Sequence, residues 1–229
     1  AALAELAERG SGLVAEGARP VVLHTSGFHG PERLARLAEL GMPVGVLHPL
    51  TAVPRGAGRM RPRLGETRYL RGVWFALNGD PEACRVAREI VSALGARPLV
   101  LEGGAEGQAL YHAAAALLSN GLVALFDAAL AITARATSDE RSAQAAFASL
   151  LGATADNLQR SSPKDALTGP VVRGELEVVG GHLDRIADLG DEALLAVYRL
   201  LGQRLVTLAA DAGRLAADRA AELRRLLGA

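Results

Sequence analysis

Two short sequences place hydrogen-bonding side chains where predicted strands end. They are His24-Thr25-Ser26-Gly27 and His48-Pro49-Leu50, and each follows or closes an apolar run. Open α/β sheets bind ligands at the carboxyl ends of their strands. His48 therefore suits a general acid or base. Proline is also common at the end of a strand for structural reasons alone, so a structural role stays open. His24 lies inside its strand run, and we expect it to be buried structure.

A third histidine lies in the longest apolar segment, residues 103–135. Good helix formers fill this segment and predict one long buried helix. At about 100° per residue, His112, Ser119 and Asp127 fall on one stripe of that helix, and Asn120 lies at its edge. Two interpretations remain open. Either neighbouring helices satisfy these polar groups internally, or the stripe faces a substrate.

Other chemistries find little support in the chain. Its single cysteine, Cys84, allows neither a disulfide nor a cysteine metal site, which suits a reducing cytosol, and we expect a cytoplasmic protein. The one lysine, Lys164, makes Schiff-base chemistry improbable. The histidines lack metal-ligand spacing, so we expect no metal. A P-loop and a nucleophile elbow are absent.

Composition narrows the class of partner. Lys+Arg and Asp+Glu are both 25 and only 3% of residues are aromatic, which argues against nucleic acid and leaves small molecules or proteins. Half of the 229 residues are hydrophobic, enough for a substantial core. Residues 109–133 are long enough for a membrane span, but His112, Asn120 and Asp127 would be costly in a bilayer. We therefore expect a soluble helix and no membrane partner.

The first half of the chain alternates strands and helices. Strands are predicted at 19–27, 43–48, 73–77 and 97–102, and helices at 31–40 and 81–94, with Asp80 as the N-cap of the second helix. A strand, a helix and a strand joined by short links form a βαβ unit, and such units make parallel sheets. A further helix is predicted over residues 1–18.

An arginine-rich loop interrupts this pattern at residues 49–72. Its arginines are residues 55, 59, 61, 63, 68 and 71. Guanidinium groups bind phosphates and carboxylates bidentately, so this loop either holds an anion or is simply solvated.

After Gly103 every pattern is helical, with further helices predicted at 139–160, 174–189, 191–212 and 214–227. We therefore predict an α/β domain at 1–102 and an all-helical domain at 103–229. The glycine-rich run that starts at Gly103 is interpreted as a hinge. Apolar surfaces on the last three helices predict a twofold homodimer that buries over about 2,000 Å².

The order of the motifs carries a family resemblance. Ser26-Gly27, His48-Pro49-Leu50 and Tyr111-His112 come first, followed by Leu167-Thr168-Gly169-Pro170…Arg173-Gly174 and His182-Leu183. This order resembles the uncharacterised Rossmann-like proteins whose helical domain is like the C-terminal domain of 6-phosphogluconate dehydrogenase. They are related to pyrroline-5-carboxylate reductase and to deazaflavin-dependent NADP oxidoreductases. The resemblance covers essentially the whole chain, and the His-Pro also looks like the motif that supplies a catalytic histidine in prephenate dehydrogenases.

The resemblance implies a fold and an activity. The fold is an N-terminally incomplete Rossmann-like parallel sheet followed by a helical domain, with the dinucleotide glycine motif upstream of this chain. The activity is an NAD(P)-dependent oxidation or reduction, with NADP or NAD as cofactor, of a small polar or anionic metabolite in the interdomain cleft. The expected catalytic residues are His112, His48, Ser119 and Asn120. The expected cofactor-binding residues are Thr25, Ser26, Gly27 and Pro49.

The chain departs from β-hydroxyacid dehydrogenases, which carry a lysine, followed by asparagine, after a Gly-Gln on this helix. Here Gly107-Gln108 is followed by Tyr111 in the lysine place and by Ala114 and Ala115 where asparagines would be. Their catalytic groups therefore cannot be carried over. The alternative function is a non-catalytic, dimeric protein that binds a nucleotide or metabolite.

Overall fold

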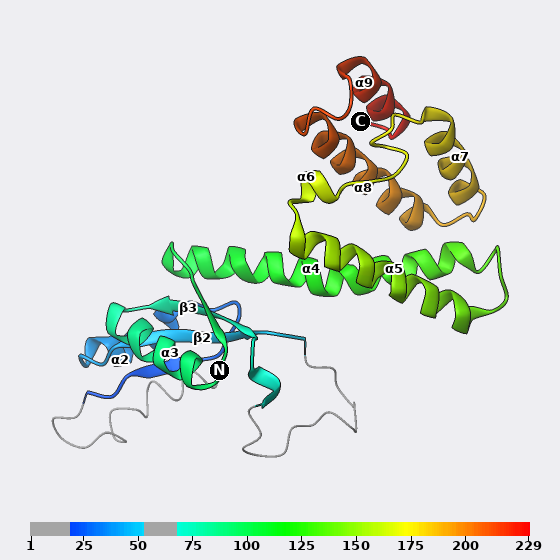
Figure 1. The fold of residues 1–229 in the computed structure, drawn as a ribbon. Coiled ribbons are helices and arrows are strands. Elements are labelled where there is room, and N and C mark those ends of the chain that lie inside the picture. The colour runs from blue at the N-terminus through cyan, green and yellow to red at the C-terminus, as the bar shows by residue number, and fades with distance from the viewer. Residues whose placement is uncertain (1–18, 53–67) are drawn as a thin grey trace. The chain divides into compact units, whose positions relative to one another are not determined.

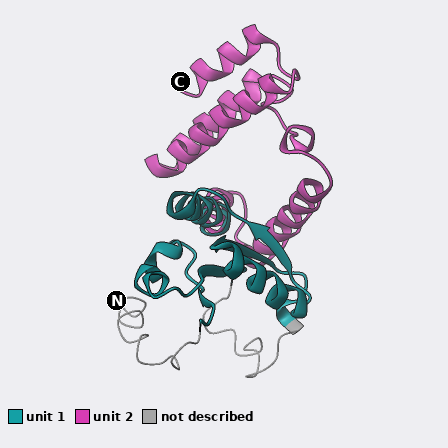
Figure 2. Ribbon diagram, turned by 90° about the vertical axis from the view of Figure 1, so that its left-hand side faces the viewer, with its two compact units in different colours: residues 1–122 teal, residues 123–229 magenta. Residues whose placement is uncertain are grey.

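The computed structural model describes residues 19–52 and 68–229. The chain divides into two compact units, residues 1–122 and 123–229 (Figure 2). The division falls inside one long helix, so the first turns of that helix belong with the strands. The predicted domain boundary after residue 102 stays a prediction. The predicted helix at 1–18 and the arginines at 55, 59, 61 and 63 lie outside the described residues.

Unit 1 is built on a four-stranded sheet in the order β1-β2-β3-β4. The strands are β1 (Val22–His24), β2 (Val44–Leu50), β3 (Trp74–Gly79) and β4 (Arg97–Val100). β1 pairs with β2 and β3 with β4 in parallel, whereas β2 and β3 are antiparallel. The predicted class, an α/β Rossmann-like part followed by helices, is confirmed. The wholly parallel sheet is wrong in one pair, because an apolar run indicates a strand but not its direction.

Helices cover both faces of this sheet (Figure 1). On one face, α3 (Pro81–Ala93) packs Ala87 and Val91 against Phe75 and Leu77. On the other, the short 3-10 helix η2 (Pro31–Leu34) and α2 (Ala35–Glu39) pack against Val44. Side chains alternate between the two faces along a strand. The second face therefore also carries the residue that pairs with Val44 in the neighbouring strand and the residues two and four positions after Val44 in β2.

Asp80 stands at the N-cap of α3, as predicted, but its side chain does not cap the helix. Its carboxylate instead accepts a hydrogen bond of 2.8 Å from the backbone N–H of Val44. The carboxylate therefore ties the start of α3 to the start of β2. A strand N–H was the stronger competitor for this oxygen, which the local sequence could not indicate.

The long helix α4 spans Gly104–Thr133 and follows a turn in which Gly103 has a φ of 79° (Figure 1). The expectation that it is buried is wrong for the single chain. Only Gln108 is buried, and Leu117 and Leu118 are 76% and 73% exposed. The sheet reaches only the first turns of α4, so the rest of its apolar surface is uncovered. By length and composition, α4 and a later helix, α8 (Glu192–Asp211), are both long and apolar enough to cross a membrane.

Unit 2 holds the end of α4 and the remaining helices. They are α5 (Glu140–Arg160), α6 (Pro163–Ala166), α7 (Leu176–Ala187), α8 (Glu192–Asp211) and α9 (Ala217–Leu226). Its core joins α7, α8 and α9 through the fully buried Val179, Val206 and Leu223. Asp139 and Asp191 cap α5 and α8 by accepting backbone N–H groups with their carboxylates.

Candidate functional site

The loop after β1 is held by His24, which is only 4% exposed. Its Nδ1 accepts a hydrogen bond of 3.2 Å from the N–H of Ser26. The other ring nitrogen, Nε2, therefore carries the proton and donates to the carbonyl of Gly30 at 3.0 Å. The prediction that His24 is buried structure is confirmed, because both of its nitrogens are used within the loop.

Ser26 and Thr25, both predicted to bind cofactor, lie in this same loop. The Oγ of Ser26 accepts a hydrogen bond of 3.1 Å from the N–H of His29, while its hydroxyl hydrogen can still be donated. Thr25 is exposed. Ser26 is partly buried, and the predicted role of both side chains stays a prediction.

Two amide side chains, which the sequence reasoning did not select, dock α4 on the sheet. The fully buried Gln108 donates from Nε2 to the carbonyl of Gly27 at 2.7 Å and accepts from Asn78 Nδ2 at 3.2 Å. Asn78 also donates to the carbonyl of Gly104 at 2.7 Å. One signal was available: Asn78 is a lone amide on a strand position that alternation turns inward, and a buried amide needs partners.

This docking brings a tyrosine and two histidines together. His48 Nδ1 and the hydroxyl oxygen of Tyr111 are 3.0 Å apart, and the two rings meet edge to face. The ring centroids of His48 and His112 are 6.2 Å apart. The exposed Phe28 places its ring 6.2 Å from that of His112. The predicted meeting of His48 with the start of the long helix is therefore found in unit 1.

Gly27 lies where the two imidazoles converge. A Cβ atom on this residue would be 2.5 Å from His112 Nδ1 and 2.8 Å from His48 Nε2. Measured from that point, the two nitrogens are at most about 5.3 Å apart, and only glycine fits between them. His112 Nδ1 is buried and has no hydrogen-bond partner in the part of the chain that the structure describes. Buried polar atoms are nearly always paired, so such an atom indicates a missing partner.

Burial affects the protonation of His48 and Tyr111. It lowers the pKa of His48, and the nearby His112 lowers it further. Burial also raises the pKa of Tyr111. At neutral pH, His48 is therefore an uncharged imidazole that can accept or donate one hydrogen bond at each nitrogen, and Tyr111 keeps its hydroxyl proton.

The structure does not bring the other predicted residues to this cluster. Ser119 and Asn120 are exposed and lie about 10–12 Å further along α4, at 1.5 Å per residue. Pro49 neighbours His48 in β2 and pairs with Phe75, so it belongs to the opposite, α3-covered face of the sheet.

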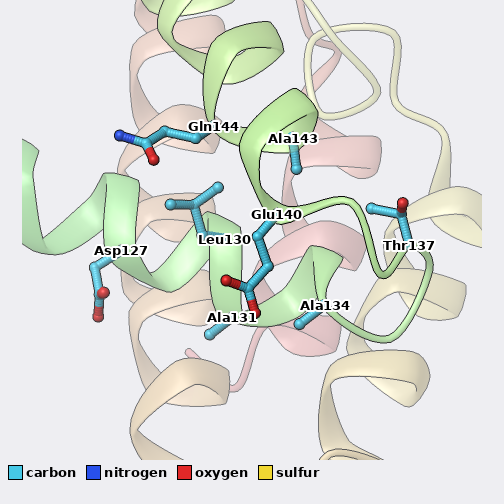
Figure 3. A pocket seen from close by; sticks show the side chains of 8 residues that line it. All are labelled: Asp127, Leu130, Ala131, Ala134, Thr137, Glu140, Ala143 and Gln144. Atoms are coloured by element: carbon cyan, nitrogen blue, oxygen red, sulfur yellow. The ribbon is translucent and has the colours of Figure 1, made fainter.

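A cavity of about 270 Å³ lies in unit 2, where α4 ends and α5 begins (Figure 3). Its lining residues are Asp127, Leu130, Ala131, Ala134, Thr137, Glu140, Ala143 and Gln144. Asp127 is the last residue of the polar stripe predicted from His112. The lining offers carboxylates but no imidazole, so this cavity lacks the side chain best suited to acid–base chemistry at neutral pH.

Comparison with known protein families identifies the family of this chain. Residues 73–205 match the model of a domain of unknown function, DUF2520. The chain belongs to the DUF2520 family. This match includes Asn78, Gln108, Tyr111 and His112, but not His48 or Gly27. No curated protein matches the chain.

Two crystal structures share the fold of this DUF2520 protein. Protein TM1727 from Thermotoga maritima has a TM-score of 0.66 and 24% identity, over 83% of this chain and 69% of that one. The "putative NADP oxidoreductase BF3122" from Bacteroides fragilis has a TM-score of 0.60 and 23% identity, over 88% of this chain and 71% of that one. The DUF2520 chain thus has the predicted Rossmann-like and helical architecture.

Proposed function

We propose that this DUF2520 protein is an NAD(P)-dependent oxidoreductase that acts on a small polar or anionic metabolite. The observation that carries the proposal is the buried Nδ1 of His112, which has no hydrogen-bond partner among the described residues and lies beside Gly27, as does Nε2 of His48. A substrate oxygen would give His112 its missing partner. The name of the similarly folded Bacteroides fragilis protein supports the choice of cofactor.

The histidines suit proton transfer at a substrate oxygen. His112 takes the proton from a substrate hydroxyl, or returns it to a carbonyl, while His48 holds the same oxygen. The nicotinamide, when bound, supplies the acceptor or donor of hydride. The two histidines suit the reacting oxygen of the substrate. The chain contains no G-x-G-x-x-G sequence, so it offers no glycine motif for the cofactor's phosphates. The loop residues Thr25, Ser26 and Gly27 are proposed to contact the bound cofactor.

We also propose a cytoplasmic homodimer. Leucines 117 and 118 are among the most exposed apolar side chains of the described chain, and Val123 is 70% exposed on the same helix. Burying one such side chain contributes about 1.5–3 kcal/mol, so a second copy of the chain is a favourable cover. A lipid bilayer is a poorer cover, because Asn120 and Asp127 lie in the same uncovered part of α4.

The test uses the full-length protein. Binding of NADPH and of NADH is followed by nucleotide fluorescence, and oxidation of the bound nucleotide is then screened with small oxo acids and aldehydes. We expect one nucleotide to bind, and His112→Ala to lower kcat/KM by about two to four orders of magnitude with the melting temperature little changed.

Two outcomes would count against the proposal. No binding of either nucleotide would favour the alternative, a non-catalytic metabolite-binding dimer. Unchanged turnover with a lowered melting temperature in His112→Ala would make this histidine a packing residue. Ser119→Ala serves as the control on the same helix, because its exposed hydroxyl lies away from the histidines.

A further inference from the structure

The contact between Tyr111 and His48 can form in two ways, which differ in the residue that donates the hydrogen. The hydroxyl oxygen of Tyr111 and His48 Nδ1 are 3.0 Å apart, and either atom can supply the hydrogen. If Tyr111 donates, a neutral His48 carries its proton on Nε2. If His48 donates from Nδ1, then Nε2 presents a lone pair. The contact therefore decides whether Nε2 is a donor or an acceptor beside Gly27.

Burial favours donation by Tyr111. Both residues are partly buried, and the pKa of Tyr111 is raised, so its hydroxyl keeps its hydrogen. If His48 donated instead, that hydroxyl hydrogen would need another acceptor, and His48 Nδ1 is its partner among the described hydrogen bonds. A partly buried donor that loses its acceptor costs free energy. Imidazole nitrogen is also the better acceptor of the two atoms, because a phenol oxygen shares its lone pairs with the ring.

The two histidines then have complementary roles. His48 Nε2 and His112 Nδ1 both lie beside Gly27, and His112 Nδ1 has no hydrogen-bond partner in the part of the chain that the structure describes. With the proton of His48 on Nε2, this nitrogen is a hydrogen-bond donor beside Gly27. The proposed function assigns the acceptor role to His112 Nδ1. A single hydroxyl oxygen can satisfy both, since it accepts one hydrogen bond and donates another.

We propose that Tyr111 is a positioning residue that fixes His48 as the Nε2–H tautomer, so that His48 donates a hydrogen bond to the substrate oxygen. The identity of that acceptor rests on the proposed oxidoreductase function. The tautomer itself does not, because the Tyr111–His48 contact lies within unit 1 and needs no ligand. Tyr111 acts through His48, and it is the residue that makes His48 a donor.

The experiment measures the tautomer directly in the unliganded full-length protein. Histidine nitrogens are labelled with ¹⁵N, and long-range ¹H–¹⁵N spectra at pH 8 distinguish protonated from unprotonated ring nitrogens. His48→Gln assigns the His48 signals. We expect the Nε2–H form of His48 in the native protein, and a roughly 2- to 10-fold loss in its ratio to the Nδ1–H form in Tyr111→Phe, the range that one net hydrogen bond provides.

The chain offers a matched control in unit 2. His182 Nδ1 and the Tyr198 hydroxyl are 2.7 Å apart, and their rings also meet edge to face. Tyr198→Phe should change the tautomer ratio of His182 and leave that of His48 unchanged. A native His48 in the Nδ1–H form, or a ratio unaltered by Tyr111→Phe, would overturn the proposal. Either result is read without cofactor, so it is separate from a failure of nucleotide binding, which bears on the proposed function.

Discussion

Gly27→Ala is the sharpest probe of the histidine cluster. The backbone of Gly27 does not have the positive φ found at eleven other described glycines, so alanine can adopt it without backbone strain. Its methyl group, however, would lie 2.5 Å from His112 Nδ1 and 2.8 Å from His48 Nε2. Ordinary van der Waals contact begins at 3.4 Å, so the rings must move by several tenths of an ångström or more.

This displacement sets the expected magnitudes. Overpacking of this kind costs about 1–3 kcal/mol in the free energy of unfolding, which urea denaturation measures. A misplacement of about 1 Å can also cost about 100-fold in rate, so kcat/KM of the active protein should fall by about that factor. The ring signals of both histidines should shift in ¹H–¹⁵N spectra.

Gly121→Ala is the control in the same unit. Its added Cβ would lie 3.5 Å from a side-chain carbon of Leu117, which is ordinary contact, and the residue lies within α4. Alanine there should stabilise the helix by up to about 1 kcal/mol and leave the histidine signals unchanged. If Gly27→Ala instead kept both the native stability and the native histidine spectra, the two rings would not converge on Gly27, and the proposed site would be lost.

Three other perturbations test the docking, the titration and the assembly. Gln108→Ala removes a buried amide and both of its hydrogen bonds, leaving the Gly27 carbonyl without its donor, and should lower the free energy of unfolding by about 2–4 kcal/mol in urea titrations. Because the pKa of His48 is lowered on folding, the unfolded chain binds more protons below pH 6.5; stability should fall as pH drops below that value, and His48→Gln should flatten this dependence. The double substitution Leu117→Glu with Leu118→Glu should convert the proposed dimer to a monomer in sedimentation, whereas a bound membrane fraction in the native protein would contradict the dimer.

The sequence predicted the elements of unit 1 well, because their signals are local. Apolar runs bounded by glycine and proline gave the strands, and Pro81 with its following helix formers gave α3 nearly to the residue. The antiparallel pairing of β2 with β3 was not predictable in this way. Periodicity reports which residues face the core, whereas strand direction depends on how the connecting chain returns, which is not a local property.

The candidate site was predicted in part for a similar reason. His48 and His112 stood out because imidazoles at a strand end and on an apolar helix are unusual, and each could be noticed alone. Gln108 and Asn78 act only as a pair that is 30 residues apart in sequence, so their role depends on the docking itself. Ser119 and Asn120 were selected by helical periodicity, which finds residues on one stripe but not how far the sheet reaches along the helix.

The helix α4 has two parts that differ in composition: its first turns dock on the sheet of unit 1, and the rest of the helix exposes an apolar surface. Its first turns carry Gln108 and Tyr111, which form hydrogen bonds with Gly27 and His48 of the sheet unit. They also carry His112, whose Nδ1 has no hydrogen-bond partner among the described residues. Beyond them the helix is apolar yet uncovered in the single chain, with Leu117 76% exposed. A helix that only held the histidine in place would need no such surface. The proposed dimer would cover the exposed leucines. Substitutions there should therefore alter assembly while leaving the His48 tautomer unchanged, because no described hydrogen bond links them to the histidines.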